Sequence, residues 1–158
     1  MCERPIVRTC TAYPASLRGT PIEEAKLQSE NELMQNKLAN FRILIAEDES
    51  LIALNLEMML RQFGCEVVGP VSDVEEVVRF AAQPLDGALV DVNLRGKQVF
   101  DALPALLERG IPVVLASGYD DTTLFPERYR ALPRISKPFD ETALRSVCIR
   151  AMFAGPAR

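Results

Sequence analysis

The chain contains no histidine and no tryptophan among its 158 residues. Without histidine, mechanisms that pair a serine or cysteine nucleophile with a histidine base are excluded, and so is every metal site with an imidazole ligand. The four cysteines form no C-x-x-C pair, so neither a zinc site nor a redox dithiol is indicated. We expect reduced thiols, two of them buried. Any chemistry must use carboxylates, hydroxyls and lysine.

The sequence also lacks long apolar runs and an excess of positive charge. Nearly uncharged stretches such as residues 111–119 are much shorter than the roughly 18 to 20 apolar residues of a membrane span. Charged residues such as Glu3 and Arg8 interrupt any apolar region of a signal peptide. The net charge of −4 provides no general field for binding phosphate backbones. We therefore expect a cytoplasmic protein without membrane insertion and without DNA as a direct partner.

The composition, with 48% hydrophobic and 25% charged residues, is typical of a globular domain with one core. Residues 1–40 differ from the rest and read as an N-terminal extension, an irregular arm followed by a helix over about 21–39 that begins at Thr20-Pro21. Apolar residues seven positions apart make this helix a candidate for a homodimer contact. The leading interpretation is that the helix packs on its own domain.

From residue 41 onward, short apolar runs alternate with amphipathic stretches. This pattern predicts an α/β fold, a five-stranded parallel sheet doubly wound by helices, over residues 41–153, with a short tail at 154–158. The predicted strands cover 41–46, 65–71, 86–91, 112–117 and 133–136. The predicted helices cover about 50–63, 73–82, 97–109, 120–131 and 140–153, the second capped by Ser72 and the fourth short or broken because Pro126 lies within it.

Polar side chains follow the apolar run of four of these strands. In an open parallel sheet the carboxyl ends of the strands meet at one edge, where ligands bind. The residues leaving the strands are Glu47-Asp48, Asp91, Ser117 and Lys137-Pro138. The sequence therefore predicts that three carboxylates, a hydroxyl and a lysine converge although they are far apart along the chain.

Four motifs at these strand ends, ILIAEDES, ALVDVNLRG, VVLASGYD and ISKPF, together resemble the receiver domain of bacterial two-component response regulators. The resemblance covers roughly residues 41–153 and implies the flavodoxin-like fold of the chemotaxis-regulator (CheY-like) type. It implies that Asp91 is the phosphoacceptor, Ser117 the switch hydroxyl and Lys137 the partner of the phosphoryl group or carboxylate. It also implies that Glu47, Asp48, Asp91 and the backbone carbonyl of Asn93 bind Mg²⁺ or Mn²⁺.

The chemistry of phosphoryl transfer explains why these residue types are needed. A carboxylate can attack phosphorus only when its repulsion from the phosphoryl oxygens is neutralised, and a hard divalent cation and a lysine can do this. Mg²⁺ prefers carboxylates, water and phosphate oxygens. Glu47-Asp48-Glu49 alone is equally compatible with first-turn acids that favour the helix dipole, and Ser117-Gly118 alone with a turn.

Two positions depart from the usual receiver pattern. Position 47 is Glu where the family more often has Asp, which lengthens a metal ligand. Arg134 occupies the position, three residues before the lysine, where many receivers carry an aromatic switch residue. This resembles an atypical subgroup with a Ser/Thr-Gly-Tyr turn, whose partners include histidine kinases of the HWE type. The alternative is that Arg134 extends its charge to solvent from an edge strand.

Three functions remain open from the sequence. The first is a stand-alone response regulator that accepts a phosphoryl group from a sensor histidine kinase or a histidine phosphotransfer protein and signals to a downstream protein, catalysing only its own phosphorylation and dephosphorylation. The second is a phosphate-independent receiver-like binding module. The third is a phosphohydrolase of the haloacid dehalogenase type, ranked last because Asn93 stands where that family has a second aspartate.

Overall fold

The computed structural model describes residue 22 and residues 36–118 and 125–154. The chain divides into two units, residues 1–33 and 34–158, and the helices and strands discussed below belong to the second. Most of the helix predicted over 21–39 therefore lies outside the described residues. At its end, residues Asn36–Leu38 form a 3-10 helix, η2, and Leu38 is buried.

The five predicted strands form one parallel sheet in the order β2-β1-β3-β6-β7. The strands are β1 (Arg42–Ala46), β2 (Glu66–Val71), β3 (Gly87–Asp91), β6 (Val113–Ser117) and β7 (Arg134–Ser136). Each begins within one residue of its predicted start. The prediction of a five-stranded parallel sheet is confirmed.

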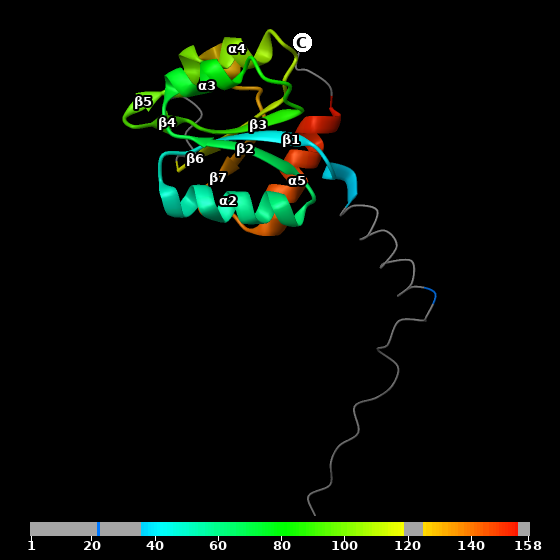
Figure 1. Cartoon of the computed structure of the whole chain (residues 1–158). Helices are drawn as coiled ribbons and strands as arrows, with labels where there is room; N and C mark the ends of the chain where they lie inside the picture. The colour runs from blue at the N-terminus through cyan, green and yellow to red at the C-terminus, as the bar shows by residue number, and fades with distance from the viewer. Residues whose placement is uncertain (1–21, 23–35, 119–124, 155–158) are drawn as a thin grey trace, which may run out of the picture. The chain divides into compact units, whose positions relative to one another are not determined.

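Helices cover both faces of this sheet (Figure 1). On one face lie α2 (Ser50–Gln62) and α5 (Glu141–Phe153), and on the other lie α3 (Val74–Phe80) and α4 (Leu103–Leu107). Two separate clusters of buried apolar side chains fill the spaces between the sheet and these two layers. The fold is therefore the doubly wound arrangement that the sequence predicts.

Capping residues mark the starts of two helices. Asp140 accepts a hydrogen bond from the Ala143 N–H at 2.8 Å and begins α5 as predicted. At α3 the cap is Asp73, whose carboxylate accepts from the Glu76 N–H at 2.8 Å, so the prediction of Ser72 as the cap is wrong by one residue. An aspartate side chain at the next position offers the helix a charged acceptor.

The helix predicted over 97–109 begins later than expected. Residues Asn93–Leu94 (β4) and Lys97–Gln98 (β5) form a two-stranded hairpin, followed by the 3-10 helix η3 (Val99–Asp101) and then α4. Arg95 and Gly96 connect the strands with φ values of 50° and 79°. A tight two-residue hairpin turn requires positive φ at both of its residues. The chain forms this hairpin where the first turn of the predicted helix was expected.

The fourth predicted helix, 120–131, is only partly described. Residues 119–124 lie outside the described residues, and after Pro126 there is a single 3-10 turn, η5 (Glu127–Tyr129). Within the described ranges, no helix is long and apolar enough to cross a membrane.

The two cysteines that the structure describes, Cys65 and Cys148, are buried free thiols, as expected. Burial raises the pKa of the Cys65 thiol to about 11 and that of the Cys148 thiol to about 12. Since the thiolate is the reactive form, both are packing residues of the core rather than nucleophiles.

Helix α2 provides a matched test of the core. Leu60 is fully buried against the sheet, whereas Leu51 on the same helix is 83% exposed. Leu60→Ala should lower the free energy of unfolding by about 3 kcal/mol, because it leaves a cavity in the core. Leu51→Ala should change it by less than about 0.5 kcal/mol. Urea unfolding followed by circular dichroism measures both, and equal losses would contradict the packing of α2 described here.

Candidate functional site

The predicted site residues do meet at the carboxyl edge of the sheet. Glu47 follows β1, Asp91 ends β3 and Ser117 ends β6. Lys137 follows β7, and its N–H donates to the Ser117 carbonyl at 2.8 Å. Neighbouring parallel strands thus bring together residues separated by up to 90 positions in the sequence.

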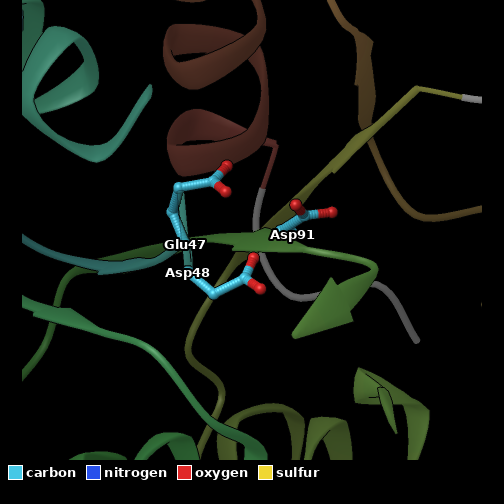
Figure 2. Close-up of side chains that lie close together, drawn as sticks. All are labelled: Glu47, Asp48 and Asp91. Carbon is cyan, nitrogen blue, oxygen red and sulfur yellow. The ribbon is translucent and has the colours of Figure 1, made fainter. Parts of the chain in front are cut away.

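Three carboxylates form a cluster at this edge (Figure 2). One carboxylate oxygen from each of Glu47, Asp48 and Asp91 lies within 4.8 Å of the other two. Glu47 is 3% exposed and Asp91 is 9% exposed, while Asp48 is half-buried. Such a group of hard oxygen donors is suited to a divalent cation.

Backbone N–H groups orient all three carboxylates. The Glu49 N–H donates to Glu47 Oε1 at 3.1 Å, and the Asn93 N–H donates to Asp91 Oδ1 at 3.1 Å. The Arg95 N–H, in the turn of the β4–β5 hairpin, donates to Asp48 Oδ2 at 3.0 Å. The hairpin that the sequence did not predict therefore contributes directly to the site, and its Arg95-Gly96 dipeptide was the available signal.

Lys137 joins two of the carboxylates. Its Nζ lies 2.6 Å from Glu47 Oε2 and 2.6 Å from Asp91 Oδ2. Burial by itself lowers the pKa of the ammonium, but the hydrogen bonds to Asp91 and Glu47 outweigh it and raise the pKa of Lys137. The pKa of Glu47 is raised by burial, which the hydrogen bond from Lys137 only partly offsets. The lysine is therefore a fixed cation between two buried acids.

A small cavity of about 90 Å³ adjoins Asp91 and Ser117. It is lined by Asp91, Val92, Asn93, Gln98, Phe100, Ser117, Gly118 and Phe125. Phe100 and Phe125 contact each other edge to face, with ring centroids 5.5 Å apart. Sequence reasoning missed both rings, because nothing local to either one relates it to Asp91; only the tertiary fold brings them to the cavity.

Phe125 also contacts Arg134, the residue at the position where many receiver domains carry an aromatic side chain. Arg134 lies on β7, an edge strand, and its guanidinium carbon is 5.2 Å from the centre of the Phe125 ring. The guanidinium thus packs on a ring instead of extending freely to solvent. The expectation that Arg134 lies on an edge strand is confirmed, but its charge does not simply extend to solvent.

Comparisons with known proteins find regulatory proteins of bacteria as relatives. The phyllosphere-induced regulator PhyR of Methylorubrum extorquens is 33% identical over 115 residues, which are 70% of this chain and 43% of that protein. The transcriptional regulatory protein PdtaR of Mycobacterium tuberculosis is 36% identical over 103 residues, which are 62% of this chain and 50% of that protein. The chain thus spans about half the length of the curated relatives it matches. No protein-family model matches it.

Solved structures of isolated receiver domains match more completely. The receiver domain of the PhyR response regulator from Erythrobacter litoralis has a TM-score of 0.67 and 26% identity, covering 76% of this chain and 95% of that one. The receiver domain of a sensor histidine kinase from Pseudomonas aeruginosa, solved with magnesium in its active-site cleft, has a TM-score of 0.61 and 25% identity, covering 72% and 98%.

The shared lysine provides a test of this geometry. Lys137→Met should lower the free energy of unfolding by about 3 kcal/mol at neutral pH in the presence of EDTA, because two buried carboxylates lose their counter-charge. Adding Glu47→Gln to the same chain should restore part of that loss. Urea unfolding of the single and double variants measures the coupling.

Lys97→Met is the matched control, since Lys97 pairs with Glu75 at an exposed site. It should leave the free energy of unfolding nearly unchanged, because an exposed ion pair is screened by solvent. If removing Lys137 and removing Lys97 had equal effects, the buried ion-pair network would not be stabilising the site.

Proposed function

The chain contains a receiver domain of the two-component response-regulator family, and from this premise we propose that it is a signalling switch that accepts a phosphoryl group on Asp91. One observation carries the proposal: Asp91 lies at a sheet edge beside Lys137 and within 4.8 Å of two further carboxylates. This arrangement combines a nucleophile with an ammonium that offsets negative charge and with carboxylates suited to holding a divalent cation.

The carboxylate cluster fits a magnesium ion. Its ligand set is made only of carboxylate oxygens, which Mg²⁺ prefers, and the donors come from two adjacent strand ends. We assign Glu47, Asp48 and Asp91 as side-chain ligands and the backbone carbonyl of Asn93 as a fourth protein ligand. When bound, the cation supplies positive charge that neutralises the acceptor and the incoming phosphoryl oxygens.

The proposed chemical step uses the free carboxylate of Asp91. One Oδ atom attacks the phosphorus of the donor, an O–P bond forms, and the bond from phosphorus to the donor atom breaks with its electron pair leaving on the donor. Lys137 then exchanges a carboxylate oxygen of Asp91 for a phosphoryl oxygen. Because the lysine is already held at 2.6 Å from Asp91, little rearrangement is needed to bring its charge to the product.

Ser117 is the residue we propose to read the product. It is 4% exposed and lines the cavity beside Asp91. Its hydroxyl can donate to a phosphoryl oxygen, which would draw the end of β6 toward Asp91 and couple a local charge to a change of shape.

The partners follow from this chemistry. We propose that the donor is a phosphohistidine of a sensor kinase, including the HWE type, or of a phosphotransfer protein in the cytoplasm, and that the output is a downstream protein. In this proposal, residues 41–153 make up the receiver and residues 1–40 an extension. The similarity to regulators such as PhyR and PdtaR supports a signalling role rather than turnover of a metabolite.

Incubation with acetyl phosphate and Mg²⁺ tests the acceptor. The intact mass should rise by about 80 Da, corresponding to one phosphoryl group. The adduct should be absent in Asp91→Asn and in the presence of EDTA. Asp101→Asn, which alters an exposed acid of η3, is the control and should be phosphorylated normally. An adduct that persists in Asp91→Asn would place the modification on another residue.

The metal site can be tested without phosphorylation. Titration calorimetry with MgCl₂ should give one binding event, and Asp48→Asn should weaken it by about tenfold or more, because a charged ligand is lost. Asp101→Asn should leave the affinity unchanged. Equal affinities of the Asp48→Asn variant and the unaltered protein would contradict the ligand assignment.

A further inference from the structure

One polar residue of the cavity beside Asp91 has no part in the phosphorylation step proposed above. Gln98 ends strand β5 of the hairpin and lines this cavity together with Asp91 and Ser117. We propose that its side-chain amide positions the water molecule that hydrolyses the phosphoryl group on Asp91, so that Gln98 sets how long the phosphorylated state lasts. This inference rests on the proposed function, since it concerns the removal of the group that Asp91 would accept.

The register of the β4–β5 hairpin directs Gln98 toward the acceptor. Directly opposed residues of an antiparallel pair point to the same face, and neighbours along a strand point to opposite faces. Asn93 is opposite Gln98, and both line the cavity. Leu94 and Lys97 form the other pair of the hairpin. Leu94 is buried in the core and Lys97 pairs with Glu75 of α3, so this second pair faces away from the cavity.

The backbone around Gln98 is tied to the acceptor strand. Val99, which directly follows Gln98, donates its N–H to the carbonyl of Val92 at 2.9 Å, and Val92 directly follows Asp91. The α-carbon of Gln98 is therefore fixed relative to the acceptor. A group that positions an attacking water needs such support, because a misplacement of about 1 Å can lower a rate about a hundredfold.

The side-chain amide of Gln98 is available for this role. Gln98 precedes the 3-10 helix η3 but forms no side-chain hydrogen bond that would cap it, and its side chain is exposed. A carboxamide has one carbonyl oxygen that accepts hydrogen bonds and two N–H groups that donate them. It can therefore accept from the O–H of a water molecule while it donates to a phosphoryl oxygen, and neither contact changes its protonation.

The cavity has room for this water. Its volume of about 90 Å³ exceeds the roughly 10 to 15 Å³ that one water molecule needs. A protein base is less suited to activating the water here. The chain contains no histidine, and the Lys137 ammonium already donates to Glu47 and Asp91. A neutral amide that orients the water is the remaining type of assistance that the cavity offers from Gln98.

In the proposed step the water oxygen attacks phosphorus in line with the bond to Asp91. A new O–P bond forms, the bond from phosphorus to the Asp91 oxygen breaks, and its electron pair returns to the carboxylate. Both protons of the water leave with the inorganic phosphate, as H₂PO₄⁻, so the step consumes no further reactant. Gln98 accelerates it by holding the attacking oxygen in line with the breaking bond.

Decay of the phosphorylated protein tests this proposal. The chain is phosphorylated with acetyl phosphate and Mg²⁺, the donor is removed by desalting into the same Mg²⁺ buffer, and the loss of the adduct is followed by intact mass. Gln98→Met keeps the length of the side chain without its amide, and should slow the decay by about tenfold. Gln98→Asn keeps the amide on a shorter side chain and should be slowed less. The Mg²⁺ affinity of both variants should equal that of the unaltered protein, which a general disturbance of the site would not allow.

Lys97→Met is the matched control, because the same new residue enters the neighbouring position on the opposite face of the hairpin. Its adduct should decay at the rate of the unaltered protein. Equal slowing in Lys97→Met and Gln98→Met would mean that a disturbed hairpin is the cause, and would overturn the proposal. Faster or unchanged decay in Gln98→Met would overturn it too, and slower decay in Asn93→Ala alone would transfer the role to Asn93.

The same experiment separates this inference from the proposed function. If the unaltered chain forms no adduct, the proposed function fails and the inference fails with it. If the adduct forms on Asp91 and decays equally fast with and without the Gln98 amide, only the inference fails.

Side-chain amide signals place Gln98 without measuring a rate. Beryllium fluoride, an analogue of the phosphoryl group, is added to the unaltered protein with Mg²⁺. The side-chain N–H signals of Gln98, assigned by their absence in Gln98→Met, should shift, and those of Gln83, just after α3, should not. Unshifted Gln98 signals in a sample whose Asn93 backbone signal does shift would contradict the contact between the amide and the phosphoryl group.

Discussion

The ion-pair network of Lys137 is the interaction on which the site depends. Two acids, Glu47 and Asp91, are almost fully buried at the carboxyl edge of the sheet, and like charges so close together repel strongly in a medium of low polarity. A single ammonium at 2.6 Å from each reduces that repulsion. The fold can therefore hold two buried carboxylates side by side at the edge of the sheet.

Glu47 is one of the two acids that contact Lys137. The longer glutamate side chain reaches Lys137, so the lysine is shared between the acceptor strand β3 and the first strand β1 rather than bound to Asp91 alone. Glu47 thus both contacts Lys137 and belongs to the carboxylate cluster.

The residues around the acceptor link it to the far edge of the sheet. Ser117 and Phe125 line the same cavity, and the guanidinium of Arg134 packs over the Phe125 ring. The side chains of Phe125 and Arg134 therefore connect the cavity beside Asp91 to the edge strand β7.

Sequence alone determined the five strands of the sheet and the residues at their ends, although not the β4–β5 hairpin, because apolar periodicity and the breaks at Gly, Pro and capping residues are local properties. It placed Glu47, Asp48, Asp91, Ser117 and Lys137 at one edge, since parallel strands share that edge. Only the tertiary structure decided that Lys137 bridges two acids, that the Arg95 turn orients Asp48, and that Phe125 lies beneath Arg134. These contacts join residues distant in sequence, and their geometry follows from packing, which no local pattern encodes.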